Sequence, residues 1–151
     1  MIENELKTTQ WIDRPLEDVF TFFSEAKNLE KITPPQLNFK ILQTSTESIE
    51  KNTLIDYKLR LHGIGFHWKT LISEFEKNEF FIDEQIKGPY KKWVHRHTFT
   101  SENNGTRIND HVVYVIPFGL IGNLFLKPYI KKELDKIFQY RESIIEKYFK
   151  D

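Results

Sequence analysis

Apolar and polar residues alternate along most of the chain, as is typical of β-strands. Between residues 37 and 116 the apolar positions are rich in β-branched and aromatic side chains, which favour strands. The alternation breaks at turn signals, of which Asn103-Asn104-Gly105 is a strong hairpin signal. We predict an antiparallel meander of six strands, with one further strand before it at residues 3–12. The six segments cover residues 37–44, 53–62, 65–76, 79–87, 91–101 and 105–116.

Two short helices are predicted between the first strand and the meander. The spacing i, i+3, i+4, i+7 gives the first helix one apolar face, formed by Leu16, Val19, Phe20 and Phe23. Asp13 is its expected N-cap, with Pro15 in the first turn. A second helix is expected at residues 26–32, because Thr33-Pro34-Pro35 would end it.

The last thirty residues change to a helical period. One apolar stripe runs along residues 120–149 and consists of Leu126, Ile130, Leu134, Ile137, Phe138, Ile144, Ile145 and Tyr148. Pro128 is expected to kink this helix or to delay its start. Such a stripe needs an apolar partner, and the concave face of the sheet is the one large candidate. The chain therefore predicts an α+β helix-grip fold, in which a curved antiparallel sheet of about seven strands wraps around a long C-terminal helix. A cavity is expected between the sheet and this helix.

Composition narrows the function classes. The 151 residues favour a single domain covering 1–151, and the absence of cysteine excludes disulfides and thiol chemistry. With 22 basic and 22 acidic residues the net charge is zero, which argues against a nucleic-acid partner and a polybasic membrane anchor. The longest apolar run, 112–126, is too short to span a membrane, and no targeting segment is visible. We expect a cytoplasmic protein.

Several stretches, in order along nearly the whole chain, carry a family resemblance. They are residues 15–20, 81–85 followed by Gly88-Pro89, 93–99, 105–114, and the tail at 117–119 and 137–141. With these motifs the chain resembles the SRPBCC superfamily of START-like and birch-pollen-allergen-like proteins. It is most similar to bacterial ligand-binding members related to the polyketide cyclase/dehydrase and coenzyme Q-binding families. The resemblance implies the helix-grip fold, but the superfamily includes binding proteins, transfer proteins and some enzymes, so it does not settle function.

Strand alternation assigns most side chains to a face. Trp93, His95 and His97 share a face with Phe99, and we place this aromatic face toward the cavity. In the segment 79–87 either face could point inward, because hydrophobicity favours Phe80, Ile82 and Ile86 whereas the resemblance favours Phe81, Asp83 and Gln85. We adopt the second alternative. The predicted ligand-binding residues are Tyr57, Trp68, Asp83, Gln85, Trp93, His95, His97, Asp110 and Tyr114.

Three interpretations of this polar and aromatic cluster remain open. His and Asp side chains could satisfy one another inside an ordinary core. They could hold the polar end of an apolar ligand whose body lies against the aromatic walls. His95, His97 and Asp110 could also act as a general acid/base pair in cyclase or dehydratase chemistry. We favour binding of a small apolar or amphipathic molecule, such as a lipid, isoprenoid, quinone or polyketide-like compound, with a cyclase/dehydratase enzyme as the alternative.

Other signals are interpreted as structural. The pair His95-x-His97 is reminiscent of a cupin metal site, but Glu102 falls in a turn and the long C-terminal helix is not a cupin ending, so no metal and no cofactor are expected. His62 and His67 are expected to be exposed. Residues 118–121 could touch a membrane transiently or gate the cavity, but packing at the helix start is the preferred interpretation. The oligomeric state is not predicted.

Overall fold

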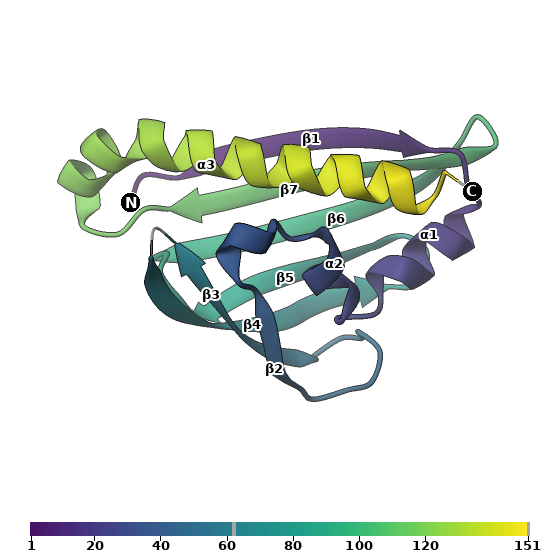
Figure 1. Ribbon diagram of the computed structural model, residues 1–151, viewed down its shortest axis with the longest axis horizontal. Helices are drawn as coiled ribbons and strands as arrows, with labels where there is room; N and C mark the ends of the chain where they lie inside the picture. Colours follow the sequence, from purple (N-terminus) through teal and green to yellow (C-terminus); the bar gives the residue numbers. More distant parts are fainter. Residues whose placement is uncertain (62, 151) are drawn as a thin grey trace.

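The computed structural model describes residues 1–61 and 63–150, and its strands form one seven-stranded antiparallel sheet (Figure 1). The strand order is β1-β7-β6-β5-β4-β3-β2. The strands are β1 Asn4–Ile12, β2 Lys40–Thr44, β3 Leu54–Leu61, β4 Ile64–Glu76, β5 Phe80–Lys87, β6 Lys92–Glu102 and β7 Gly105–Val115. The predicted meander is confirmed. Only β2 starts clearly later than predicted, because residues before it form the 3-10 turn η1, Pro35–Leu37.

The three α-helices also lie where the sequence places them. They are α1 Leu16–Phe23, α2 Asn28–Ile32 and α3 Gly119–Tyr148. The prediction of Asp13 as N-cap of α1 is wrong, since Pro15 occupies the cap position and no side chain caps the helix. Glu17 and Asp18 in the first turn supply the negative charge that the helix N-terminus favours.

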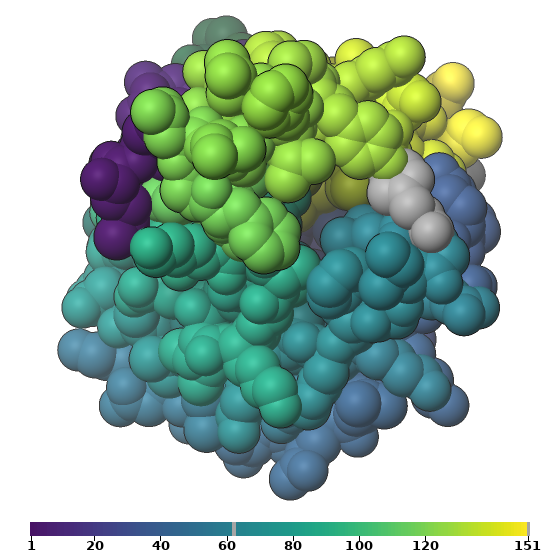
Figure 2. Space-filling view, turned by 90° about the vertical axis from the view of Figure 1, so that its left-hand side faces the viewer, coloured from purple at the N-terminus to yellow at the C-terminus, as the bar shows by residue number. Residues whose placement is uncertain are grey.

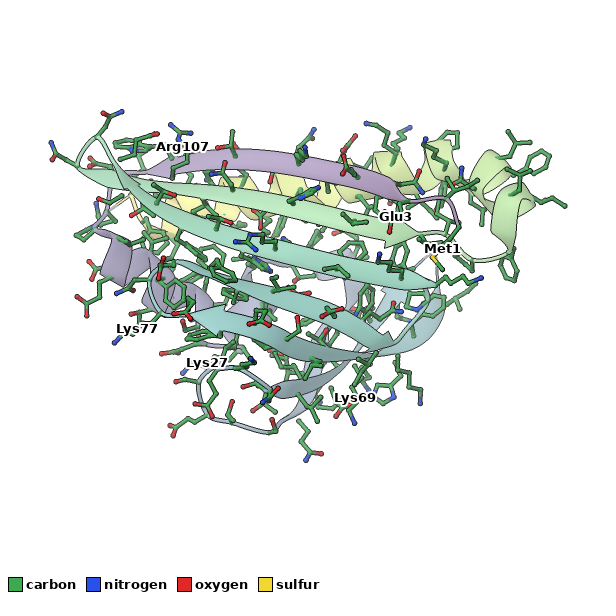
Figure 3. All side chains as sticks on the ribbon, turned by 180° about the vertical axis from the view of Figure 1, so that it is seen from behind. Met1, Glu3, Lys27, Lys69, Lys77 and Arg107 are labelled. Atoms are coloured by element: carbon green, nitrogen blue, oxygen red, sulfur yellow. The ribbon has the colours of Figure 1, made fainter. Side chains whose placement is uncertain are left out.

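The long helix α3 lies along the sheet, and α1 and α2 close the space beside it (Figure 1). Breaks in the pairing register within β4, at Lys69/Thr70 and Ile72/Glu74, are the kind of irregularity that bends a sheet. The outer face of the sheet carries polar side chains such as Arg107 and Lys69 (Figure 3). In residues 1–61 and 63–150 no helix is long and apolar enough to cross a membrane.

Two apolar clusters fill the space between sheet and helices. The first surrounds Phe20 of α1, whose ring meets that of Phe99 edge-on at 5.0 Å. The second joins Trp68 and Trp93 of the sheet to Leu134 and Phe138 of α3. The predicted apolar stripe of α3 thus packs on the concave face of the sheet, as expected for a helix-grip fold.

The facing of the strands follows the prediction, including the ambiguous strand β5. Phe81 is 4% exposed and lies in the core, whereas Ile86 on the other face is 52% exposed. Asp83 therefore points inward, beside the histidines of β6. His67 is exposed, as predicted, and His62 lies outside the described residues.

The start of α3 differs from the prediction in two ways. Pro128 does not delay the helix, which begins at Gly119 and contains the proline. The expected packing of residues 118–121 is wrong, because Phe118, Leu120 and Ile121 are 81%, 72% and 70% exposed. Phe118 takes the left-handed conformation at φ 71°, which is uncommon for a residue other than glycine.

Candidate functional site

A cavity of about 170 Å³ lies between the sheet and the helices. Its walls are mainly apolar and aromatic, with contributions from β3, β4, β5, β6 and α3. Figure 2 shows a recess at the end of the molecule where the start of α3 faces the β3–β4 hairpin. An engineered apolar cavity of about 150 Å³ accepts benzene, so this cavity has room for a small ring compound. Larger ligands would need the walls to move apart.

Six of the nine predicted ligand-binding residues line this cavity. They are Tyr57, Trp68, Asp83, Trp93, His95 and His97. Trp68 stacks on Tyr57 and meets Trp93 edge-on, so these rings form a continuous aromatic wall. Tyr57 also lies 3.4 Å from the Thr70 hydroxyl, and burial raises the pKa of Tyr57 so that it stays a neutral phenol.

The other three predicted residues are not part of the cavity wall. The Gln85 amide donates to the Tyr90 carbonyl at 2.7 Å and accepts from the Tyr90 amide at 3.1 Å, so it holds the β5–β6 loop. Tyr114 is buried against Tyr90 and Trp93. Asp110 lies behind the two histidines, on their side facing β7 and α3.

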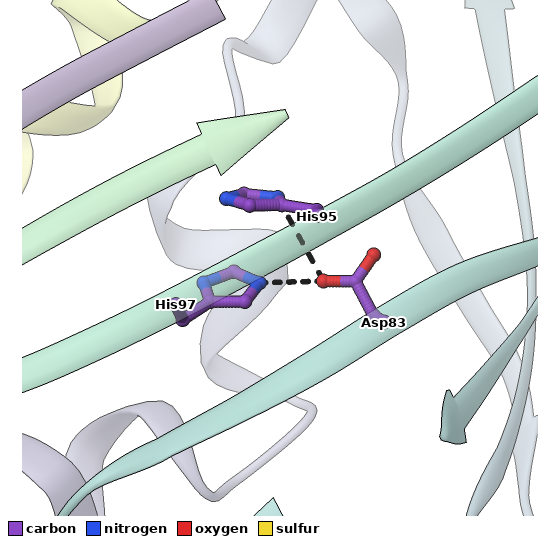
Figure 4. Close-up of side chains that lie close together, drawn as sticks. All are labelled: Asp83, His95 and His97. Carbon is purple, nitrogen blue, oxygen red and sulfur yellow. Dashed lines mark hydrogen bonds and ion pairs between the residues drawn. The ribbon is translucent and has the colours of Figure 1, made fainter. Parts of the chain in front are cut away.

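Two histidines and two aspartates form a compact cluster at the cavity wall. Figure 4 shows three of them, Asp83, His95 and His97. The His95 and His97 rings are stacked, with centroids 3.6 Å apart. Asp83 Oδ2 lies 2.5 Å from His97 Nε2 and 3.7 Å from His95 Nδ1. On the other side, Asp110 Oδ1 lies 2.7 Å from His95 Nε2 and 3.3 Å from His97 Nδ1. Each imidazole is thus placed between two carboxylates.

The strand register explains this arrangement. His95 and His97 are two residues apart on β6 and therefore point to the same face. Asp83 on β5 is paired with His95, and Asp110 on β7 is paired with His97. Each carboxylate consequently has one histidine directly opposite and the other at a diagonal position, which is also within reach.

Arg141 of α3 completes the cluster and was missed in the sequence. Its guanidinium Nη2 lies 3.7 Å from Asp110 Oδ1, and the side chain is only 12% exposed. Arg141 is three residues after Phe138 and four before Ile145, both of which are buried. A single charged residue on the buried stripe of a helix was the signal that could have identified it.

The buried groups of the cluster shift one another's pKa values. Burial disfavours both carboxylates, but the pKa of Asp110 is held well below its ordinary value by Arg141 and by hydrogen bonds from the histidines. Burial and the charge of His97 lower the pKa of His95. For His97, burial is outweighed by Asp110 and Asp83, which raise its pKa. Of the two histidines, His97 therefore holds a proton more readily.

In the described part of the chain, three buried nitrogens of cavity-lining residues have no hydrogen-bond partner. His97 Nδ1 and Arg141 Nη2 lie 3.3 Å and 3.7 Å from Asp110 Oδ1, and the third is the indole Nε1 of Trp68. An unpaired buried donor costs about 1–3 kcal/mol, so such groups normally find an acceptor. A ligand with an acceptor oxygen would supply one.

The same cluster has a donor set suited to a metal ion. Asp83, His95 and His97 each offer a ligand atom, and these atoms lie within 4.8 Å of one another. Nitrogen and carboxylate donors suit first-row divalent ions.

Fold and sequence together place the chain in the SRPBCC superfamily. The sequence matches the polyketide cyclase/dehydrase and lipid transport family over residues 12–139, and the chain belongs to this family. No curated protein matches the sequence.

Solved structures share the fold. A protein from Thermus thermophilus is 19% identical, with a TM-score of 0.70 over 95% of both chains. The aromatase/cyclase Zhui from Streptomyces is 9% identical, with a TM-score of 0.77 over 99% of this chain and 94% of its own. A major latex-like protein of Panax ginseng is 11% identical, with a TM-score of 0.71 over 99% of both chains. At these identities the likeness shows the fold alone.

Proposed function

We propose that the protein binds a small amphipathic molecule, non-covalently, in the cavity between sheet and α3. The observation that carries this proposal is the combination of aromatic walls with two buried donors that make no hydrogen bond, Trp68 Nε1 and Arg141 Nη2. An apolar body would lie against the rings, and an acceptor oxygen would pair with these donors. We propose that the ligand enters between the loops near Gly63, Gly88 and Pro117, and the cytoplasmic location also stays a prediction.

The cavity volume narrows the ligand class. Pockets for drug-sized ligands are about 300–1,000 Å³, whereas this cavity measures about 170 Å³. A compound with one ring, or the ring end of a quinone or polyketide-like molecule, fits this volume. A long lipid or isoprenoid chain would have to extend out through the mouth.

The cyclase/dehydratase alternative is supported by a different observation. The two stacked imidazoles have pKa values displaced in opposite directions, so one is suited to donate a proton and the other to accept one. Both line the cavity. Turnover that is lost in His95→Gln, with ligand binding retained, would distinguish the enzyme from a binding protein.

Binding can be tested with benzoate, a ring compound that carries an anionic acceptor. The three tryptophans provide the readout, because each indole N–H gives its own NMR signal. We expect benzoate to shift the signals of Trp68 and Trp93, while Trp11, which donates to the Glu102 carbonyl far from the cavity, stays unchanged. Toluene, which lacks the acceptor, should shift Trp68 less. Equal shifts at all three indoles, or no shift, would refute the proposal.

A further inference from the structure

We propose that Asp83, His95 and His97 bind a first-row divalent metal ion at the cavity wall. His95 Nδ1 and His97 Nε2 both face Asp83 Oδ2, at 3.7 Å and 2.5 Å, so three ligand atoms converge from neighbouring strands (Figure 4). Two imidazoles and one carboxylate on one side of an ion form the facial arrangement of non-haem metal sites, which leaves further positions open. Here the open positions face the cavity.

The groups behind the histidines support the same site. Metal-bound imidazoles almost always present their other nitrogen to a carboxylate or carbonyl, which fixes the ring and its tautomer. Asp110 Oδ1 lies 2.7 Å from His95 Nε2 and 3.3 Å from His97 Nδ1. One carboxylate therefore orients both rings, and Arg141 stands behind it at 3.7 Å.

The net charge of the cluster indicates which ligand group a bound metal ion would favour. The two aspartates and Arg141 together carry one formal negative charge, so a divalent ion between neutral imidazoles leaves the cluster with one net positive charge. An anionic oxygen from the ligand, such as a carboxylate, enolate or phenolate, would neutralise it inside an apolar cavity. The inference thus goes beyond the proposed function, because binding of an acceptor by Trp68 and Arg141 does not require the ion.

The test uses untagged protein treated with a chelator and then dialysed against Co²⁺ or Zn²⁺. We expect one ion per chain and a Co²⁺ visible spectrum of a site with nitrogen ligands. Asp83→Asn should abolish stoichiometric binding, and Asp110→Asn should weaken it about 10–100-fold. The matched control is Asp56→Asn, because Asp56 pairs with exposed His67 at 3.1 Å on the outer surface.

If Asp83→Asn fails to fold, the site is tested through the imidazole NMR signals of the wild-type protein. Zn²⁺ should shift the signals of His95 and His97 and leave the signal of His111 unchanged. Folded wild-type protein that takes up no ion, or binding that Asp56→Asn removes, would overturn the site. The benzoate titration in chelator-treated protein is independent, so failure of the metal site and failure of the cavity proposal are distinguishable.

A separate observation carries a second inference, at the exposed start of α3. The α3 apolar face consists of Phe118, Leu120, Ile121, Leu124 and Phe125, which are between 68% and 81% exposed. These side chains project at the end of the molecule beside the recess seen in Figure 2. Contiguous exposed apolar side chains on this scale mark an interaction surface.

We infer that the α3 apolar face docks on an anionic phospholipid bilayer. Residues 118–132 contain three lysines and no acidic residue, so positive charge flanks the apolar side chains. Lys127, Lys131 and Lys132 are exposed in the two turns that follow the face, and Lys131 also pairs with Asp135. Apolar insertion combined with basic flanks is the pattern by which amphipathic helices bind anionic membranes.

Vesicle flotation tests the docking. We expect binding to vesicles of phosphatidylcholine and phosphatidylglycerol that weakens in high salt, and much less binding to phosphatidylcholine alone. Leu124→Ser with Phe125→Ser should reduce binding at least tenfold, whereas Ile86→Ser, an exposed apolar residue on β5, should not. Absence of vesicle binding, or a dimer in sedimentation that the double variant dissociates, would overturn the membrane inference.

Discussion

Removal of the Arg141 charge should destabilise the protein more than removal of an exposed arginine would. Arg141 and Asp110 are 12% and 10% exposed, and their charges lie 3.7 Å apart. Breaking a buried pair by removing one partner costs about 3–5 kcal/mol, but His95 also bonds Asp110 and limits the loss. We expect Arg141→Met to lower the free energy of unfolding by ~2–3 kcal/mol, which is roughly 4–12 °C in Tm for a chain of this length.

Urea and thermal unfolding followed by circular dichroism measure this change, with a chelator present. The matched control is Arg107→Met, because Arg107 pairs with Glu102 at a position where both are about one-third exposed, and such pairs contribute about 0–1 kcal/mol. In an Asp110→Asn background the cost of Arg141→Met should fall below ~1 kcal/mol, since the buried carboxylate charge is gone. Equal costs for Arg141→Met and Arg107→Met would refute the reasoning.

The same variant changes the response to acid. The folded pKa of Asp110 lies below its unfolded value of about 3.9, so its contribution to stability is full above that pH and is lost as the pH falls through the folded pKa. Arg141→Met raises the folded pKa. Loss of stability on acidification should therefore begin at a higher pH in the variant than in the wild-type protein. If urea unfolding gives the same pH dependence of the unfolding free energy for both proteins at acidic pH, Arg141 does not lower the pKa of Asp110.

The remaining predictions concern Gly122 in the first turn of α3 and Gln85 on β5. Gly122→Ala should destabilise the protein by ~1–3 kcal/mol, because an added Cβ would lie 1.9 Å from the Pro117 carbonyl oxygen; Gly65→Ala, with nothing within 4 Å, is the control, and equal Tm values would contradict the prediction. Gln85→Ala removes both hydrogen bonds to Tyr90 and should speed amide hydrogen exchange at Tyr90, while unchanged exchange would show that the loop is held by other contacts.

Much of the fold could be predicted from the sequence because its signals are local. Period-two alternation and turn residues place each strand, and consecutive antiparallel strands then pair in order. The inward positions of His95 and His97 follow from the same alternation, whereas for Asp110 the family resemblance favoured the inward face. Asp83 needed the family resemblance, because both faces of β5 carry apolar residues and a shift of one residue reverses every side chain.

The rest depends on packing that periodicity does not determine. Gln85 lies on the inward face as predicted, but the turn at Gly88 brings the Tyr90 backbone back onto its amide. The rotation of α3 decides that Arg141 reaches Asp110. Phe118 takes a left-handed backbone conformation that no sequence pattern indicated.

Native mass spectrometry of untagged protein, taken directly from purification, tests the central claim most directly. We expect a discrete small-molecule adduct, one per chain, that organic solvent releases. A matched variant, Leu59→Trp, fills the cavity from a wall position and should carry no adduct. A bare polypeptide mass for the wild-type protein, or the same adduct on both proteins, would contradict the assignment of the cavity as the binding site.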